Sequence, residues 1–228
     1  QMYWSEFIQK LSRPERTAET FVEYKSYAKP QQDELKDVGG FVGGTLLNGK
    51  RKNESAGVRY LVTLDADTIE PGGTQRIINR VSALGCTYVI YSTRKHEGAA
   101  PRLRIIVPLD RECGSEEYEA IARKLAEFID INIFDPTTFE PVRLMYWPSC
   151  SKDSEFVFFY EDKPFLSKDG MLGLYGNWQN IEEWPQVPGA VKLRERSAKK
   201  QGDPLSKSGI VGAFCKNYSI EEAMAEFI

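Results

Sequence analysis

Three short apolar segments in the middle of the chain have the length and composition of β-strands. They cover residues 59–67, 87–93 and 102–109. Residues 74–84 lie between the first two and have an apolar face at helical spacing, made of Ile77, Ile78, Val81 and Leu84. The short connections after this helix favour antiparallel pairing of the strands. This order of elements predicts an α/β fold of the α+β type.

Helical spacing of apolar residues also predicts helices outside this central region. They cover residues 2–11, 17–27 and 116–130. The last is the clearest, with an apolar stripe made of Tyr118, Ile121, Leu125 and Phe128. The glycine-rich run at residues 36–44 suits either a hairpin between short strands or a loop that faces a substrate, and the pattern leaves both open.

The composition is that of a folded, soluble protein. Of 228 residues, 41% are hydrophobic and 28% are charged, which is enough apolar material for a substantial core. The formal net charge is -3, so a nucleic-acid partner needs a local basic face rather than overall charge. No apolar run has the length of a membrane span, and the start of the chain lacks a signal-peptide pattern. We therefore expect no membrane partner and a cytoplasmic location.

Changes in composition along the chain indicate one main domain and a tail. We expect the main domain to cover residues 1–190, followed by an exposed linker at residues 191–208 that is rich in Lys and Arg. Residues 209–228 have a helical pattern after a short apolar opening, which predicts the start of a C-terminal helical segment. Because the sequence starts without Met and stops within this pattern, we expect it to be part of a longer protein.

Cysteine and histidine usage excludes several kinds of site. The four cysteines are far apart in the sequence, at Cys86, Cys113, Cys150 and Cys215. We expect reduced, packed thiols rather than a zinc site or a disulfide framework. The chain has one histidine, His96, which excludes mechanisms that need two histidines.

Two acids end the first central strand. Asp65 and Asp67 are two residues apart, so they project from the same face of a strand. Carboxylates this close repel each other unless a cation lies between them or one of them is protonated. On these grounds alone, a solvated strand end or a turn explains the pair equally well.

Other polar residues follow the later apolar segments. Asp135 precedes a proline, where a turn or cap residue is an alternative interpretation. His96 follows the second strand, and Arg102 and Arg104 share one face of the third. Three acids can hold two Mg²⁺ or Mn²⁺ ions, and His and Arg side chains can bind phosphate oxygens. The combination therefore suits a nucleoside triphosphate bound with divalent metal.

In their order and spacing, these segments resemble the archaeo-eukaryotic primase superfamily. The similarity is to the primase–polymerase modules of phages and mobile elements, which are usually fused to a virulence-associated-E-like or superfamily-3 helicase. The family's first motif, an apolar strand ending in Asp-x-Asp, is matched by residues 61–67. Its second, a histidine after a strand, is matched by residues 91–96, and its third, an apolar residue and an acid, by Phe134 and Asp135. The resemblance covers roughly residues 10–165.

The resemblance implies a nucleotidyltransferase, a DNA primase or DNA-directed polymerase that uses nucleoside triphosphates on a single-stranded DNA template and primer, with a fused or partner helicase. It implies an N-terminal αβ unit and an RNA-recognition-motif-like sheet around a central catalytic cleft, within residues 1–190. The implied catalytic residues are the Mg²⁺ or Mn²⁺ ligands Asp65, Asp67 and Asp135, together with His96. The implied nucleotide contacts are His96 and Arg104, with Ser92, Arg94 or Arg143 beside them. Many family members have Ser two residues before the histidine. In this sequence that position is Arg94, and Arg94 can take over the role of the serine.

Three other classes fit part of the pattern. A Mn-dependent glycosyltransferase also uses Asp-x-Asp at a strand end, but it has no need of the later His96, Arg104 and Asp135. A metal-dependent nuclease could use the same acids and would cut DNA without consuming nucleotides. A catalytically silent module of a replication initiator would bind single-stranded DNA without incorporating nucleotides. Assays of nucleotide-sugar turnover and of nucleotide incorporation separate these classes.

Overall fold

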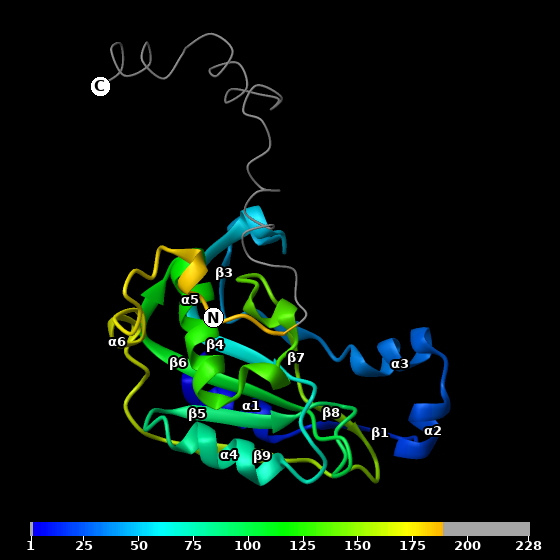
Figure 1. Cartoon of the computed structure of the whole chain (residues 1–228). Coiled ribbons are helices and arrows are strands. Elements are labelled where there is room, and N and C mark those ends of the chain that lie inside the picture. The colour runs from blue at the N-terminus through cyan, green and yellow to red at the C-terminus, as the bar shows by residue number, and fades with distance from the viewer. Residues whose placement is uncertain (1, 189–228) are drawn as a thin grey trace, which may run out of the picture. The chain divides into compact units, whose positions relative to one another are not determined.

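A five-stranded antiparallel sheet forms the centre of the protein (Figure 1). The computed structural model describes residues 2–188, so the expected linker at 191–208 and helical segment at 209–228 lie outside the described residues. The sheet has the order β3-β4-β6-β5-β9, and each neighbouring pair is antiparallel, which confirms the predicted pairing. Its strands are β3 (Gly44–Leu46), β4 (Ala56–Ala66), β5 (Tyr88–Ser92), β6 (Leu103–Cys113) and β9 (Phe158–Glu161).

Helices cover both faces of this sheet. α1 (Trp4–Ser12) packs on one face through a buried apolar cluster made of Phe7, Leu11, Val89, Tyr91 and Ile106. α4 (Thr74–Ser82) and α5 (Ser115–Ile129) lie on the opposite face (Figure 1). The chain order is β4–α4–β5–β6–α5, and β6 lies between β4 and β5 in space. This is the arrangement of an RNA-recognition-motif-like sheet, so the predicted α/β fold is confirmed.

The buried face of α5 differs from the prediction at one position. Tyr118, Ile121 and Leu125 are buried as predicted, but Phe128 has 53% of its surface exposed and Ile129 is buried instead. Ile129 comes about three full turns after Tyr118, whereas Phe128 points roughly 80° away from that line. The predicted stripe was wrong at this last position. Over three turns, the 3.6-residue period places Ile129, and not Phe128, on the buried face.

A strand and two short helices make up the N-terminal segment after α1. They are β1 (Glu15–Thr17), α2 (Phe21–Ser26) and α3 (Lys29–Lys36). β1 pairs in parallel with β8 (Ser149–Ser151), so the helix predicted at 17–27 starts later. It begins after Thr20, whose hydroxyl accepts a hydrogen bond from the Glu23 N–H in a capping box. Both helices lie beside one end of the sheet (Figure 1).

The glycine-rich run at residues 36–44 forms two strands that pair with different partners. β2 (Gly40–Phe41) pairs with β7 (Met145–Tyr146), whereas β3 pairs with β4. The hairpin interpretation was therefore wrong. Gly44 permits a close approach of the two backbones, because a Cβ atom there would lie 2.2 Å from the Val58 carbonyl oxygen.

The remaining described helices are short. They are α6 (Lys168–Leu172) and 3₁₀ helices at Leu47–Gly49, Asn53–Ser55, Ile131–Ile133, Pro136–Phe139 and Ile181–Glu183. Buried, free thiols are found at Cys86, Cys113 and Cys150, as predicted, while Cys215 lies outside the described residues. Within residues 2–188, no helix is both long and apolar enough to span a membrane.

Candidate active site

The strand register places Asp65 directly opposite a buried arginine. Asp65 of β4 pairs with Arg104 of β6, and Tyr91 of β5 follows across the sheet. Opposite residues in antiparallel strands share a face, so these side chains lie side by side. The Arg104 Nε atom is 3.4 Å from Asp65 Oδ1, and Arg104 Nη1 donates a 2.8 Å hydrogen bond to the Tyr146 carbonyl oxygen. Burial is the largest single influence and works to lower the pKa of Arg104, but the contributions of Asp65 and then Tyr91 together outweigh it and the pKa is raised.

Asp65 is almost completely buried. Only 7% of its surface is exposed, and its Oδ1 atom has no hydrogen-bond partner among the described residues. Its backbone is engaged, since its N–H donates to the Thr138 hydroxyl and its carbonyl oxygen accepts from the Asp135 N–H. A buried carboxylate oxygen without a donor is costly. Oδ1 is therefore suited to a ligand that brings positive charge.

Asp67 lies just beyond the end of β4. Its Oδ1 atom is 2.9 Å from Arg102 Nη1, and its side chain is 35% exposed. Burial and then the charge of Asp65 raise the pKa of Asp67, and Arg102 offsets this only in part. The two carboxylates thus repel each other, as their spacing in a strand predicted.

The third acid, Asp135, reaches the end of β4 through its backbone. A β-bridge joins Ala66 to Phe134, and the Asp135 N–H donates a 3.0 Å hydrogen bond to the Asp65 carbonyl oxygen. The Asp135 carboxylate, however, accepts hydrogen bonds from both the N–H and the hydroxyl of Thr137, and its Oδ2 is 2.8 Å from Arg143 Nη2. It therefore acts as the cap of a 3₁₀ helix and as an ion-pair partner.

The described residues contain no group of three or more His, Cys, Asp or Glu side chains placed to hold a metal ion. Asp67 and Asp135 each face an arginine in this arrangement, Arg102 and Arg143. The structure brings the backbones of the three acids together, but it turns the third carboxylate to Arg143. Spacing in the sequence does not show which of several basic residues a carboxylate pairs with in the folded chain.

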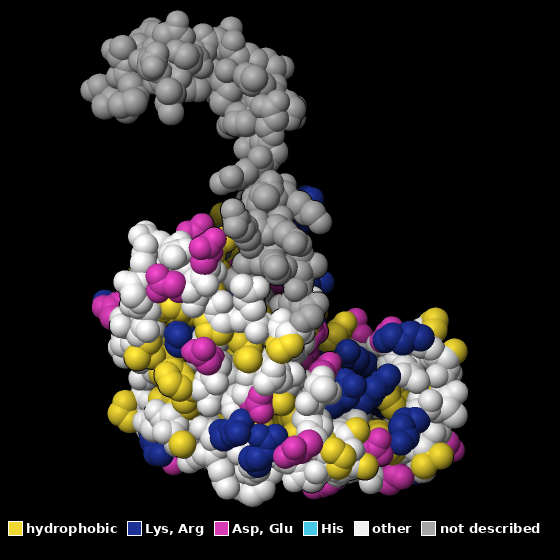
Figure 2. Space-filling model, viewed as in Figure 1, with side chains coloured by type: hydrophobic (Ala, Val, Ile, Leu, Met, Phe, Trp, Pro, Cys, Tyr) yellow, Lys and Arg dark blue, Asp and Glu magenta, His cyan; other side chains and the backbone are white. Residues whose placement is uncertain are grey.

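A cavity of about 180 Å³ opens beside Asp65 and Asp67. Its lining comes from α2 and α3, from the β5–β6 turn and from the strand ends, and it comprises Tyr24, Lys29, Asp33, Lys36, Asp65, Asp67, Thr93, Arg94, Lys95, Arg102 and Arg104. Six of these residues are Lys or Arg and three are Asp, so the lining favours an anionic ligand. Figure 2 shows Lys and Arg side chains gathered on the surface between the sheet and α3.

Sequence reasoning missed the wall of this cavity that α2 and α3 provide. Lys36, the last residue of α3, is half-buried, and its pKa is lowered by burial and by the charge of Arg104. Lys36 is the first residue of the glycine-rich run at residues 36–44. That run was the feature of the sequence that could have pointed to Lys36. The glycines do not line this cavity; Gly43 and Gly44 line a separate, apolar one beside Trp147.

His96 is buried in the turn between β5 and β6. Its Nδ1 atom is 3.1 Å from the Arg102 N–H nitrogen and 3.3 Å from the Arg102 carbonyl oxygen. Burial lowers the pKa of His96, and the backbone hydrogen bond with Arg102 opposes this. A neutral ring that accepts the Arg102 N–H carries its hydrogen on Nε2, which is then a donor. His96 does not line the cavity itself, although its neighbour Lys95 and its partner Arg102 do.

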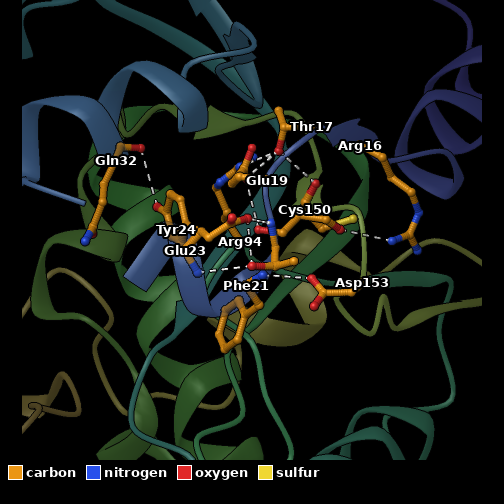
Figure 3. A network of polar contacts seen from close by, with 12 residues as sticks. Arg16, Thr17, Glu19, Phe21, Glu23, Tyr24, Gln32, Arg94, Cys150 and Asp153 are labelled. Atoms are coloured by element: carbon orange, nitrogen blue, oxygen red, sulfur yellow. Dashed lines mark hydrogen bonds and ion pairs between the residues drawn. The ribbon is translucent and has the colours of Figure 1, made fainter. Parts of the chain in front are cut away.

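The other expected nucleotide contacts differ in position. Arg94 lines the cavity, and its guanidinium pairs with Glu19 and donates a hydrogen bond to the Thr17 hydroxyl (Figure 3). The guanidinium also lies 4.5 Å from the centre of the Tyr24 ring. The Ser92 hydroxyl accepts a 2.9 Å hydrogen bond from the Val157 N–H and does not line the cavity. Arg143, paired with Asp135, also lies outside the lining.

Comparisons with known proteins show which family the chain belongs to. A solved structure, the AEP domain (PP-N190) of the cyanophage S-2L primase-polymerase, is similar with a TM-score of 0.43 and 12% sequence identity, over 64% of this chain and 76% of that chain. At this level, the similarity says nothing about the activity of this chain. A search of the curated proteins finds no match. The model of the VapE N-terminal domain family matches residues 1–187, so the chain belongs to the VapE N-terminal domain family.

Proposed function

We propose that this domain is a primase–polymerase, which joins nucleotides from nucleoside triphosphates on a single-stranded DNA template. The observation that carries the proposal is the cavity, where two carboxylates at the end of β4 lie beside a lining rich in Lys and Arg. Carboxylates and cations side by side suit a polyphosphate bound with a divalent metal ion. The order of motifs in the sequence and the VapE family match support the same conclusion.

Arg104 is a basic residue of the cavity that we expect to orient the triphosphate. Arg104 is held rigidly by Asp65 and the Tyr146 carbonyl oxygen, and a guanidinium can donate two parallel hydrogen bonds to phosphate oxygens. Arg94 also lines the cavity, but its guanidinium is already paired with Glu19. A neutral His96 has Nε2–H as a donor, next to the lining residue Lys95, and Arg143 is paired with Asp135 outside the lining.

The acids at the end of β4 fit a divalent cation. Asp65 Oδ1 is buried without a hydrogen-bond partner, and the charge of Asp65 raises the pKa of Asp67 beyond the effect of burial, so positive charge between them would relieve both costs. Asp65 and Asp67 would hold Mg²⁺ or Mn²⁺. Asp135 would join them as a ligand if its carboxylate left its ion pair with Arg143. When bound, such an ion lowers the pKa of the attacking hydroxyl and neutralises charge on the leaving pyrophosphate.

The reaction is a nucleotidyl transfer. The 3′-hydroxyl oxygen of a primer attacks the α-phosphorus of the incoming nucleotide, the bond to the β-phosphate breaks, and pyrophosphate leaves while the hydroxyl proton passes to solvent. The residues of this chain orient the triphosphate and stabilise the charge that develops on it. Template and primer are the remaining partners, with a helicase fused to this domain or acting beside it.

Incorporation of labelled nucleotides tests the proposal. The full chain is incubated with single-stranded DNA, with or without a primer, and with Mg²⁺ or Mn²⁺. We expect extension in the wild type and its loss in Asp67→Asn. The matched control is Asp169→Asn, which removes another exposed Asp–Arg pair, with Arg111, far from the lining. Equal incorporation by wild type and Asp67→Asn would refute the assigned site.

One observation favours a second candidate, a nucleic-acid-binding module without polymerase activity. Asp67 and Asp135 are both paired with arginines, and the described residues contain no assembled three-acid metal site. Such a module would bind single-stranded DNA and incorporate no nucleotide with either metal ion. The same assay, combined with a DNA-binding measurement, separates the two candidates.

A further inference from the structure

Most of the positive charge around the cavity is already neutralised by nearby acids. Four of the six lining cations have a carboxylate within ion-pair distance, in the pairs Lys29–Asp33, Arg94–Glu19, Arg102–Asp67 and Arg104–Asp65. Two lining cations, Lys36 and Lys95, form no ion pair with any described residue. The unbalanced charge of the cavity therefore belongs to these two lysines.

Lys36 lies deep on the α3 side of the cavity. Its Nζ atom is 4.9 Å from the centre of the Tyr146 ring, the residue whose carbonyl oxygen accepts from Arg104. Burial and then the charge of Arg104 lower the pKa of Lys36. A half-buried ammonium that faces another cation is unfavourable, and an anion between them would reverse the sign of both interactions.

Lys95 comes from a different element, the turn between β5 and β6 that carries His96. Lys36 and Lys95 both line the cavity, and so does the carboxylate of Asp33. The charges of both lysines contribute to the lowered pKa of Asp33, after the hydrogen bond that Lys29 donates to it. The cavity therefore has one ammonium from α3 and another from the β5–β6 turn.

We propose that Lys36 and Lys95 form a two-sided clamp for the terminal phosphates of a nucleoside triphosphate. This rests on the proposed function and deepens it, because it names the residues that bind the polyphosphate and separates them from cations engaged in ion pairs. Lys29, Arg94 and Arg102 then chiefly hold the walls together. A flexible ammonium with three donors suits a phosphate group that arrives and leaves as pyrophosphate in every cycle.

Nucleotide binding without turnover tests the clamp. Binding of dATP to the full chain is measured by calorimetry without DNA, with inorganic triphosphate as a competitor. The variants are Lys36→Met and Lys95→Met, which keep the apolar stem of the side chain and remove the charge. The matched control is Lys29→Met, because Lys29 lines the same cavity but pairs with Asp33 at 2.5 Å. Far-ultraviolet circular dichroism checks that each variant is folded.

We expect Lys36→Met and Lys95→Met each to weaken dATP binding by about 10- to 100-fold, the loss typical of a hydrogen bond to a charged group, and Lys29→Met by less than about 2-fold. Inorganic triphosphate should compete with dATP in the wild type and lose most of this ability in the two clamp variants. Equal effects of all three substitutions would overturn the clamp while leaving the polymerase proposal intact if the wild type still extends primers. A wild type that neither binds dATP nor extends primers would overturn both.

Discussion

Replacement of Asp65 should destabilise the fold, whereas replacement of Asp67 should not. Among the described residues, Asp65 is the only carboxylate paired with Arg104, which is 4% exposed, and Asp65→Asn removes it. Asp67→Asn removes a half-buried partner of Arg102 and also relieves the repulsion that, after burial, raises the pKa of Asp67. The two acids are two residues apart, yet the sheet gives them different structural roles.

The loss of stability in Asp65→Asn depends on which contacts Arg104 keeps. Removing one partner of a buried ion pair typically costs about 3–5 kcal/mol. Here the 3.4 Å contact is not a hydrogen bond, and Arg104 keeps its 2.8 Å bond to the Tyr146 carbonyl oxygen, so the lower end applies. Relief of the repulsion between the acids returns about 1 kcal/mol. The net loss for Asp65→Asn is therefore roughly 2 kcal/mol, or a fall in Tm of about 4–8 °C for a domain of this size.

Thermal and urea unfolding in EDTA measure this difference. We expect Asp67→Asn to stay within about 2 °C of the wild type, because exposed ion pairs contribute little. The double variant Asp65→Asn with Arg104→Met should recover part of the loss, since no buried charge is then left unpaired. Equal Tm shifts for the two single variants would refute the assigned roles. Asp67→Asn is therefore the cleaner variant for activity assays.

The other predictions concern the residues around the cavity. His96→Asn should raise KM for the nucleotide about 10-fold with a smaller change in kcat, and an unchanged KM would contradict a phosphate contact. Burial lowers the pKa of His96, so the unfolded chain takes up a proton at higher pH than the folded one. Wild-type stability should therefore fall as pH drops below about 6.5, and urea titrations of His96→Asn should lack this component. Arg143→Gln should tighten Mn²⁺ binding severalfold by freeing Asp135, as measured by electron paramagnetic resonance, and adding Asp135→Asn should abolish the gain. Ser92→Ala should cost about 1 kcal/mol of stability by leaving the part-buried Val157 N–H unpaired, and weakened nucleotide binding without loss of stability would contradict this structural role.

Local sequence determined the central sheet and half of the candidate site. Short apolar runs and short connections were enough to predict β4, β5 and β6 and their antiparallel pairing. The two-residue period of a strand put Asp65 and Asp67 on one face at its end. The periods of helices and strands repeat within a few residues, so these features can be read along the chain.

Tertiary structure alone decided which charges meet. Asp135 is 70 positions after Asp65 in the chain, and only the packing of its segment along β4 brings the two backbones together while turning its carboxylate to Arg143. Lys36 reaches the cavity because α3 lies beside the end of the sheet, and no local pattern records that placement. Ion pairing depends on distances of a few ångströms between segments remote in sequence, and those distances exist only once the chain has folded.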